Sequence, residues 1–278
     1  MLIDLHVHST ASDGTLSPQE VVFHAKEKGL HAIALTDHDT ISGLGEAIEA
    51  GTLYQVEVIP GIELSADFPN DNLHFLGLCI DYKNKDFLTK LTPLRDARKI
   101  RNAKMLTQLQ GLGFNITIDE NSNITTRAHF ARALLEAGYV ASMNEAFDLY
   151  LSPGKPGYAK RVTPSPEECI DLIHQAGGVA ILAHPTLYNL SMVKLEELIA
   201  KLAAYGLDGI EAIYALHSPE EEAYFMDLAR KYHLIISGGS DFHGNNKPGL
   251  ELGIGYGNLK VPYAVLDRIK IEAGLKNE

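Results

Sequence analysis

The chain has 278 residues, of which 45% are hydrophobic, and its formal charge is −12 at pH 7. The apolar content excludes an intrinsically disordered chain, and the negative charge argues against a stable electrostatic complex with long nucleic acid. The two cysteines, Cys79 and Cys169, form no CxxC or zinc-ribbon pattern and are typical of a reduced, cytoplasmic protein. The longest apolar runs, such as residues 179–183, are too short to span a bilayer, so we expect no membrane association.

Short apolar runs alternate with amphipathic segments along most of the chain. The expected strands lie at residues 2–7, 31–36, 56–62, 73–79, 179–183, 208–213 and 234–238. The expected helices lie at residues 18–28, 40–50, 166–176, 194–205 and 219–232. This alternation predicts βα units on a parallel sheet, and the length of the chain suits an α/β barrel.

Two of the expected helices have well-marked starts. Ser17 is followed by proline and then by Glu20, and Ser165 is followed by proline and then by Glu168. A serine three residues before a glutamate is the signature of a capping box, and proline is tolerated at the first helical position. We therefore expect helices to begin directly after both serines.

The central part of the chain departs from this alternation. Helical patterns follow one another with no strong strand between them, at residues 86–113, 127–139 and 144–151, and a loop rich in proline and glycine follows at 152–157. We expect residues 87–161 to form a helical insertion that acts as a substrate cap. The barrel would then comprise residues 1–86 and 162–278.

Metal-capable side chains stand at or just after the ends of the apolar runs. Two pairs are separated by one residue: His6 and His8 in "DLHVHST", and Asp241 and His243 in "SDFHG". Residues i and i+2 of a strand point to one face, and the carboxyl ends of barrel strands meet at one mouth. Five further residues belong to the set: Asp13, His38, Glu63, His74 and His184. We call the whole set, including the two pairs, the candidate ligands.

The composition of this set indicates more than one metal ion. Histidines mixed with carboxylates suit Zn²⁺, Mn²⁺ or Fe²⁺ better than Ca²⁺, and the set is too large for one tetrahedral ion with three protein ligands. A lone histidine at a strand end is more often structural than a ligand, but so many candidates on separate strands are difficult to obtain by chance. We therefore expect two to three divalent ions that share a carboxylate.

The motifs resemble those of the PHP family, named for polymerase and histidinol phosphatase. The matching stretches are "DLHVHSTASDGTLSP", "AIALTDHDTISG", "VIPGIELS", "LHFLGLCID", "GGVAILAHP" and "SGGSDFHG". They cover the N-terminal and C-terminal thirds of the chain in the family's order. "SDGTLSP" and "TDHDT" are most similar to a bacterial subgroup of small phosphoesterases, which includes nucleoside 3′,5′-bisphosphate phosphatases and a 5′-to-3′ exoribonuclease of short RNA.

The resemblance implies an α/β fold, namely a distorted (β/α)7 TIM-like barrel with a helical insertion, and a trinuclear metal site. It implies a first ion held by His6, His8, Glu63 and Asp241. It implies a second ion held by Glu63, His74 and His184, and a third held by Asp13, His38 and His243. Some relatives carry histidine where this chain has Asp13, so the chain keeps a ligand there but adds a negative charge.

The expected activity is the metal-dependent hydrolysis of phosphate esters of nucleotides. The substrate would be the 3′-phosphate of a nucleoside 3′,5′-bisphosphate, a short 5′-phosphorylated oligoribonucleotide, or both. A metal-bridging hydroxide would attack phosphorus, the ions would clamp the phosphoryl oxygens, and His38 or His243 would protonate the leaving oxygen. The expected catalytic residues are Glu63, His38, Asp241 and His243.

Basic residues of the insertion are expected to bind the substrate. Arginine can hold phosphate through two parallel hydrogen bonds, and Arg127 resembles a phosphate-contacting position of the subgroup. We interpret the charged run at residues 95–104 as a solvated helix face. The expected substrate-binding residues are Arg127, His129, Lys155, Tyr158, which could stack on a base, Arg161 and His217.

Three alternatives remain open from the sequence. Another small phosphate monoester, such as histidinol phosphate, could be the substrate. A C–N hydrolase of the amidohydrolase type also uses an HxH pair on the first barrel strand, but it usually adds a lysine ligand, and no lysine ends an expected strand here. In an alternative of a different class, the chain is a non-catalytic module that metals only stabilise.

Overall fold

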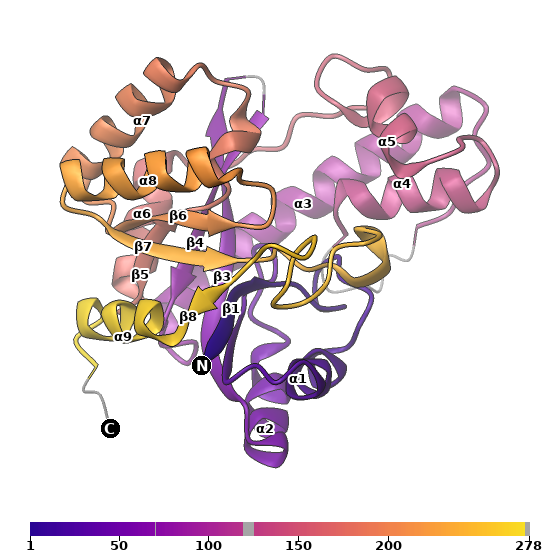
Figure 1. Cartoon of the computed structure of the whole chain (residues 1–278). Coiled ribbons are helices and arrows are strands. Elements are labelled where there is room, and N and C mark those ends of the chain that lie inside the picture. The colour runs from indigo at the N-terminus through magenta and orange to yellow at the C-terminus, as the bar shows by residue number, and fades with distance from the viewer. Residues whose placement is uncertain (70, 119–124, 276–278) are drawn as a thin grey trace.

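The computed structural model describes residues 1–69, 71–118 and 125–275, and its strands form one 8-stranded sheet that curls into a nearly closed barrel (Figure 1). The strands, in chain order, are β1 (Leu2–Val7), β2 (Ala32–Leu35), β3 (Glu57–Phe68), β4 (Asp71–Leu78), β5 (Val179–Leu182), β6 (Gly209–Tyr214), β7 (Ile235–Gly239) and β8 (Val261–Pro262). Their order in the sheet is β7-β6-β5-β4-β3-β2-β1-β8. The expected α/β barrel is therefore confirmed, with the short β8 as an additional strand.

The first and seventh strands close the barrel. The backbone N–H of His8 donates to the carbonyl of Phe242 at 2.9 Å, and the N–H of Asp241 donates to the carbonyl of His6 at 2.9 Å. This close approach explains the glycine pair that precedes "SDFHG", because a Cβ atom on Gly239 would lie 2.4 Å from the Cβ atom of His6. The closure therefore brings the two metal-capable pairs of the sequence side by side.

The expectation of a parallel sheet was wrong at two places, around β4 and at the edge, where β8 is antiparallel to β1. β3 pairs with β4 in antiparallel fashion, and so does β4 with β5, whereas β1–β2, β2–β3, β5–β6 and β6–β7 are parallel. β3 ends at Phe68 and β4 begins at Asp71, and so short a connection has no room for a crossover helix. β3 also extends beyond the expected 56–62, because Leu64 and Ala66 continue its buried alternation past Glu63.

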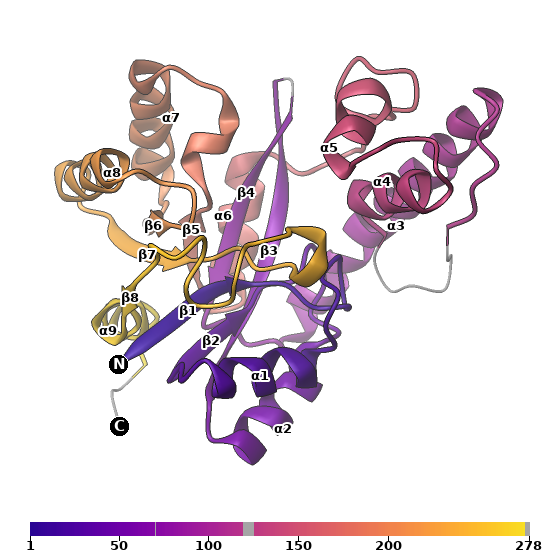
Figure 2. The same ribbon diagram turned by 45° about the vertical axis from the view of Figure 1, so that its right-hand side comes forward.

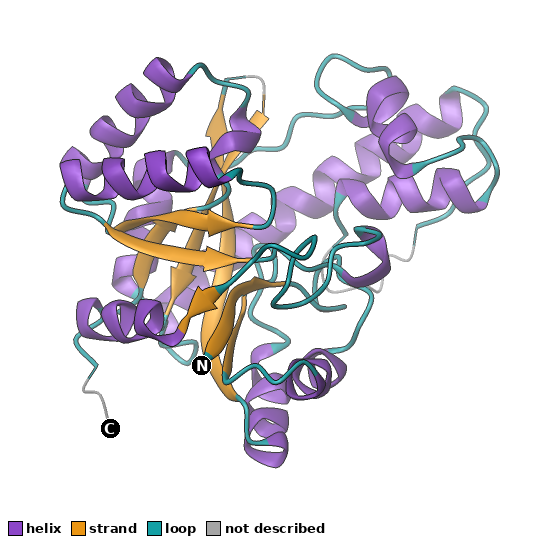
Figure 3. Ribbon diagram, viewed as in Figure 1, coloured by secondary structure: helices purple, strands orange, loops and turns teal. Residues whose placement is uncertain are grey.

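The helices surround the strands (Figure 3). Their bounds are α1 (Pro18–Glu27), α2 (Leu44–Tyr54), α3 (Lys85–Gly111), α4 (Arg127–Glu136), α5 (Met143–Ala146), α6 (Pro166–Gln175), α7 (Met192–Tyr205), α8 (Pro219–Lys231) and α9 (Tyr263–Glu272). Both expected capping boxes are confirmed, since Ser17 accepts from the N–H of Glu20 and Ser165 accepts from that of Glu168. The sequence did not lead us to expect β8 or α9.

Three hydrophobic clusters hold these layers together. The largest lies between the strands and helices α1, α2, α6, α7 and α8. A second one joins alternate residues of the strands, such as Ile3 and Leu5, to α9. The third, centred on Met105, Leu109 and Phe130, lies within the helical segment that contains α3, α4 and α5. Figures 1 and 2 both place this segment beside the barrel, on the side away from α8.

Within the described ranges, no helix is both long enough and apolar enough to cross a membrane.

Candidate metal centre

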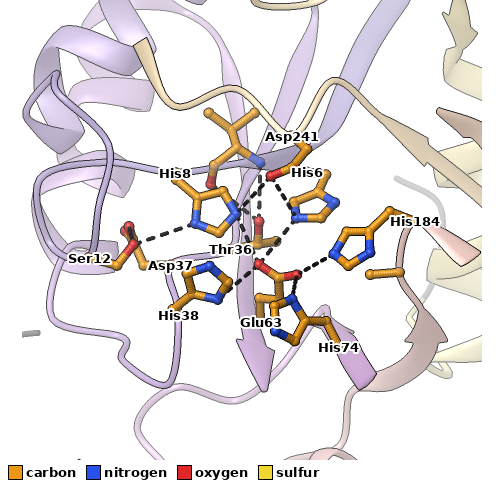
Figure 4. Close-up of polar contacts among 12 residues, drawn as sticks. His6, His8, Ser12, Thr36, Asp37, His38, Glu63, His74, His184 and Asp241 are labelled. Atoms are coloured by element: carbon orange, nitrogen blue, oxygen red, sulfur yellow. Dashed lines mark hydrogen bonds and ion pairs between the residues drawn. The ribbon is translucent and has the colours of Figure 1, made fainter. Parts of the chain in front are cut away.

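The candidate ligands, which are widely separated in the sequence, lie close together in space. Figure 4 shows the side chains of His6, His8, His38, Glu63, His74, His184 and Asp241 in one group. One of them lies in each of β1, β3 and β4, and the others follow the ends of strands or lie in the adjoining loops. In this order they are His6 from β1, Glu63 from β3, His74 from β4, and His8, Asp13, His38, His184, Asp241 and His243 from the segments outside the strands. The convergence expected from the barrel topology is therefore present.

Glu63 lies at the centre of the group and is almost completely buried. Histidines surround both of its carboxylate oxygens. Oε1 lies 2.8 Å from His74 Nδ1 and 3.0 Å from His184 Nε2. Oε2 lies 3.0 Å from His8 Nε2, 3.1 Å from His38 Nδ1 and 3.3 Å from His6 Nε2. One carboxylate thus contacts two separate sets of imidazoles, as a bridging ligand must.

Two further carboxylates lie on either side of this centre. Asp241 Oδ1 is 3.4 Å from His8 Nε2 and 3.3 Å from His243 Nδ1. Asp13 Oδ1 is 3.3 Å from His243 Nε2, and its Oδ2 is 3.8 Å from His38 Nε2. The imidazole of His243 therefore stands between the two carboxylates.

Several polar atoms of this group are buried and have no hydrogen-bond partner in the described part of the chain. They include His6 Nε2, His8 Nε2, His38 Nδ1, His74 Nδ1 and Glu63 Oε2. Buried polar atoms are normally paired, and a divalent cation satisfies the lone pairs of imidazole and carboxylate together. The donor atoms therefore fit divalent ions.

The ligand atoms fall into groupings that lie within 4.8 Å of one another. The three groupings are His8, Asp13, His38 and His243; His6, His8 and Asp241; and His38, Glu63 and His74. His8 and His38 each belong to two of them. Adjacent ions would therefore share a dense set of ligands.

The electrostatics of the group favour a cation. Burial by itself would raise the pKa of Glu63, but His38 and the other histidines hold that pKa well below its usual range. Burial likewise opposes a charge on His6, but Glu211 and Asp241 raise its pKa well above its usual value. The carboxylates that favour a proton on the buried imidazole of His6 also attract a divalent ion.

Backbone strain accompanies the site. Asp39, His184 and Asp241 have positive φ angles of 50°, 26° and 58°, a region that costs residues other than glycine about 1–3 kcal/mol each. Each of them is a candidate ligand or lies next to one. The surrounding structure holds these loops in conformations that the isolated chain would avoid.

Buried carboxylates, to which the sequence interpretation assigned no role, form hydrogen bonds with candidate ligands or with residues next to them. Asp4 accepts from the N–H and hydroxyl of Ser240, and Asp37 accepts from the hydroxyl of Ser9 at 2.7 Å. Glu211 contacts His6 Nδ1 at 2.9 Å. A charged residue inside an apolar strand pattern, as in "GIEAIY" (209–214), was the available sequence signal for Glu211.

A cavity opens directly beside the candidate ligands. One part of its lining consists of His38, His74 and Asp13. Another part consists of four arginines, Arg98, Arg101, Arg127 and Arg161, and includes Tyr158 and Phe147. We call this place the arginine cavity. The arginines come from α3, from the start of α4 and from the segment that returns to the barrel.

A single carboxylate, Asp39, pairs with two of these arginines. Arg98 Nε donates to Asp39 Oδ2 at 2.7 Å, and Arg161 Nη1 donates to the same oxygen at 2.6 Å. Both guanidinium groups are buried. Asp39 directly follows His38, so it links the candidate ligands to the arginine cavity.

Arg101 is different, because its guanidinium is buried without full pairing. The residue is 5% exposed, and its Nε and Nη2 atoms have no hydrogen-bond partner within the described ranges. Burial, together with repulsion from Arg98 and Arg161, lowers its pKa to about 8. Because an arginine remains charged in proteins, the lowered pKa of Arg101 means that no nearby anion among the described residues balances its buried charge.

Our interpretation of residues 95–104 as a solvated face was wrong for Arg98 and Arg101. Both continue the buried stripe of α3 that Leu91 and Met105 belong to. Their helical spacing from these apolar residues was a signal for burial. Lys99 and Lys104 on the same helix are exposed, as expected.

The other expected substrate-binding residues differ in position. Tyr158 and Arg127 line the cavity, with the Arg127 guanidinium 5.9 Å from the centre of the Tyr158 ring. His129 accepts from the N–H of Thr126 in a capping box of α4. Lys155 is exposed and does not line the arginine cavity.

His217 also lies away from the arginine cavity lining. It is buried, its Nδ1 lies 2.8 Å from the carbonyl of Ala212, and its ring packs against Tyr214 and Phe225. These contacts are those of a histidine that packs within the fold.

Comparisons with known proteins agree with this geometry. The chain matches the PHP domain over residues 4–153. It is 38% identical over 260 residues to the 5′-3′ exoribonuclease Rnm of Escherichia coli (strain K12), which covers 91% of this chain and 88% of that protein. It is 36% identical over 257 residues to the 3′,5′-nucleoside bisphosphate phosphatase of Chromobacterium violaceum, which covers 90% of each chain.

Solved structures show the same fold. A Chromobacterium violaceum protein described as an amidohydrolase, with bound sulfate and no metal, has a TM-score of 0.84 at 36% identity over 91% of this chain and 90% of its own. A proposed metal-dependent phosphoesterase of Bifidobacterium adolescentis has a TM-score of 0.85 at 30% identity over 97% of this chain and 95% of its own. The barrel and the helical segment together therefore have close structural counterparts.

Proposed function

The chain belongs to the PHP family, and from this premise we propose that it is a metal-dependent phosphoesterase that hydrolyses phosphate esters of nucleotides. The preferred substrate is a nucleotide that carries a second phosphate, either a nucleoside 3′,5′-bisphosphate that loses its 3′-phosphate or a short 5′-phosphorylated oligoribonucleotide. The names of the relatives from Escherichia coli and Chromobacterium violaceum support both substrates. Two or three divalent ions, of Mn, Fe or Zn, are the proposed cofactors.

One observation supports this proposal above all others: the arginine cavity lies directly beside the candidate ligands, so that a phosphate could bind at each. The candidate ligands would receive the phosphate that is cleaved, and the arginine cavity beside them has room for another anion. Within the described ranges, Arg101 lacks partners for two of its nitrogens, and the single negative charge of Asp39 balances only one of the two positive charges of Arg98 and Arg161. A second phosphate would supply the missing acceptors, because phosphate oxygens bind guanidinium groups through charge-assisted hydrogen bonds.

The proposed ligand sets are those that the family resemblance implies, and they overlap in part with the groupings of the site. The first ion would be held by His6, His8, Glu63 and Asp241, the second by Glu63, His74 and His184, and the third by Asp13, His38 and His243. The short distances from Glu63 to both sets of imidazoles support its role as the bridge. His38 Nδ1 also lies 3.1 Å from Glu63 Oε2, so His38 would stand at the boundary between the second and third ions.

Bound divalent ions would supply an acidified water and polarise the phosphoryl oxygens. The residues of the chain then have separate tasks. The arginines hold the second phosphate and so fix the distance of the scissile ester from the candidate ligands. His38 lines the cavity and His243 does not, which favours His38 over His243 as the residue that would protonate the leaving oxygen, through the ring nitrogen that holds no metal ion.

We propose that residues 87–161 form the substrate cap of the barrel, which comprises residues 1–86 and 162–278. The segment supplies Arg98 and Arg101 from α3 and Arg127 from α4. The loop that leads back to the barrel supplies Tyr158 and Arg161. The Tyr158 ring would offer a stacking surface for a base. The barrel would thus provide the metals, and the cap would select the substrate.

A comparison of four substrates tests the proposal. The metal-loaded protein is incubated with adenosine 3′,5′-bisphosphate, adenosine 3′-monophosphate, a 5′-phosphorylated oligoribonucleotide and histidinol phosphate, and kcat/KM is measured for each. We expect the doubly phosphorylated nucleotide or the oligonucleotide to be preferred. A preference for histidinol phosphate would instead support the alternative of a small monoester phosphatase.

The non-catalytic alternative is tested with the same preparation. If metals only stabilise the fold, no phosphate is released from any substrate with added Mn²⁺, although removal of the metal by a chelator lowers the unfolding temperature. The proposal requires phosphate release that the chelator abolishes.

Arg101→Ala is expected to reduce kcat/KM on adenosine 3′,5′-bisphosphate by about 10²-fold, because a desolvated guanidinium that contacts an anion contributes on the order of 3 kcal/mol. The loss on adenosine 3′-monophosphate should be much smaller, since that substrate has no second phosphate. Lys99→Ala is the matched control, as it removes an exposed positive charge two residues earlier on the same helix. Equal losses on both substrates would contradict the assigned role of Arg101.

A further inference from the structure

β6 stands apart from the other central strands at the candidate metal centre. β1, β3 and β4 carry candidate ligands, and the segments after β2, β5 and β7 carry the others, but none lies in β6 or directly after it. β6 nevertheless has two polar side chains that point at the site, Glu211 and Tyr214, which are 0% and 2% exposed.

A local irregularity aims both side chains in the same direction. Residues three positions apart in a regular strand point to opposite faces. The register between β6 and β7 shifts between Glu211 and Ile213, which indicates an extra residue in β6. Such bulges are common next to active sites, where they redirect a side chain.

Glu211 contacts two candidate ligands from two different strands. Its Oε1 lies 2.9 Å from His6 Nδ1, and its Oε2 accepts the backbone N–H of His184 at 2.6 Å. A carboxylate can only accept here, so His6 Nδ1 must carry the hydrogen. The lone pair of His6 is then on Nε2, the atom that faces Glu63 and Asp241.

Tyr214 acts in the same way on a third ligand. Its hydroxyl donates to Asp241 Oδ2 at 3.0 Å. The other oxygen, Oδ1, is then the one that faces His6, His8 and His243. Together with Lys247 Nζ, which pairs with the same Oδ2 atom, the hydroxyl orients Asp241 so that Oδ1 is presented to the site.

We propose that β6 is an orienting strand, in which Glu211 and Tyr214 act as positioning residues that fix the tautomer of His6, the backbone of His184 and the orientation of Asp241 for metal binding. Glu211 joins His6, assigned to the first ion, to His184, assigned to the second. It therefore couples the two positions through one buried carboxylate, in addition to the bridge formed by Glu63. The proposal rests on the metal-binding part of the proposed function and is independent of the substrate.

Glu211→Gln tests this role. The amide has one acceptor and one donor end, so it cannot accept from both His6 Nδ1 and the His184 N–H. We expect the dissociation constants for Mn²⁺ and Zn²⁺, measured by competition with a chelating dye, to rise by about 10- to 100-fold, as for other carboxylates behind histidine ligands. Wild-type metal affinity in this variant would overturn the proposal.

Asp208→Asn is a matched control at the other end of the same strand. Asp208 lies 2.7 Å from His174 Nε2 and accepts the N–H of Ala180 at 2.7 Å. Like Glu211, Asp208 contacts a histidine ring and a backbone N–H, but it does so through one oxygen, Oδ2, and away from the candidate ligands. We expect this variant to bind metals like the wild type, and an equal loss of affinity would show that loosened strand packing explains both.

A measurement on the wild type covers the case in which Glu211→Gln does not fold. In the Zn²⁺-loaded protein, long-range ¹H–¹⁵N spectra report which nitrogen of each histidine carries hydrogen. The proposal requires His6 to be protonated at Nδ1, and protonation at Nε2 would refute it. If the metals bind as proposed but no phosphate ester is hydrolysed, only the proposed function fails.

Discussion

Glu63→Gln is expected to abolish nearly all phosphoesterase activity, with a fall in kcat of about 10⁴-fold or more. The substitution replaces a bridging carboxylate by a neutral amide, and each ion contributes several kcal/mol to the stabilisation of transition-state charge. The metal content should fall together with the activity. Glu63 contacts imidazoles through both oxygens, so both adjoining ion positions lose a ligand at once.

Glu57→Gln is the matched control, because it removes a carboxylate from the opposite end of the same strand. Glu57 pairs there with Lys270 and accepts from the hydroxyl of Tyr263. Metal content per chain is measured by elemental analysis after loading and buffer exchange, and turnover is measured on the same samples. Wild-type stoichiometry and turnover in Glu63→Gln would refute its assignment as the bridge.

The positions of the strands could be predicted from the sequence, but their directions could not. Apolar runs marked β1, β2, β5, β6 and β7 to within about two residues, since each strand is buried on both faces and so reads as a continuous run. Nothing in such a run states whether it is parallel to its neighbours. That depends on the connection, and the break between Phe68 and Asp71 is short enough to force an antiparallel return.

The candidate ligands were predictable for the same reason. The carboxyl ends of barrel strands meet at one mouth, so the topology by itself brings His6, Glu63 and His184 together. Their positions relative to the expected strands were therefore enough to predict that they lie close together. The distances among them, and the sharing of His8 and His38 between groupings, required the structure.

The residues behind and beside the ligands were much harder to predict. Arg98 and Arg101 lie on a helix rich in charges, and only their spacing from Leu91 and Met105 separates them from their exposed neighbours. The ion-pair partner of Arg98, Asp39, is 59 positions away in the sequence. Contacts between such distant side chains depend on tertiary packing, which no local pattern specifies.

Asp13→Ala is expected to reduce kcat/KM by about 10³-fold while two ions per chain remain bound. Asp13 belongs to one grouping with His8, His38 and His243, and no grouping of the described residues contains both Asp13 and Glu63. Its loss should therefore empty the third position selectively. The two remaining ions keep Glu63, and the substrate loses one clamp of several kcal/mol.

The competing explanation is that Asp13 only shapes the loop after β1. The loop is tight, since a Cβ atom on Gly14 would lie 2.5 Å from the carbonyl oxygen of His8, and the backbone carbonyl of Asp13 accepts from Asn246 Nδ2. These contacts involve the backbone, however, and Ser17 caps α1 without Asp13. The carboxylate instead faces His243 and His38, which makes a purely structural role insufficient to explain its position.

Asp227→Ala is the control for this prediction. It removes an exposed carboxylate on α8 and should leave both metal content and kcat/KM unchanged. If Asp13→Ala retains three ions and full activity, Asp13 is a loop residue and the remaining ligands hold all three ions without it.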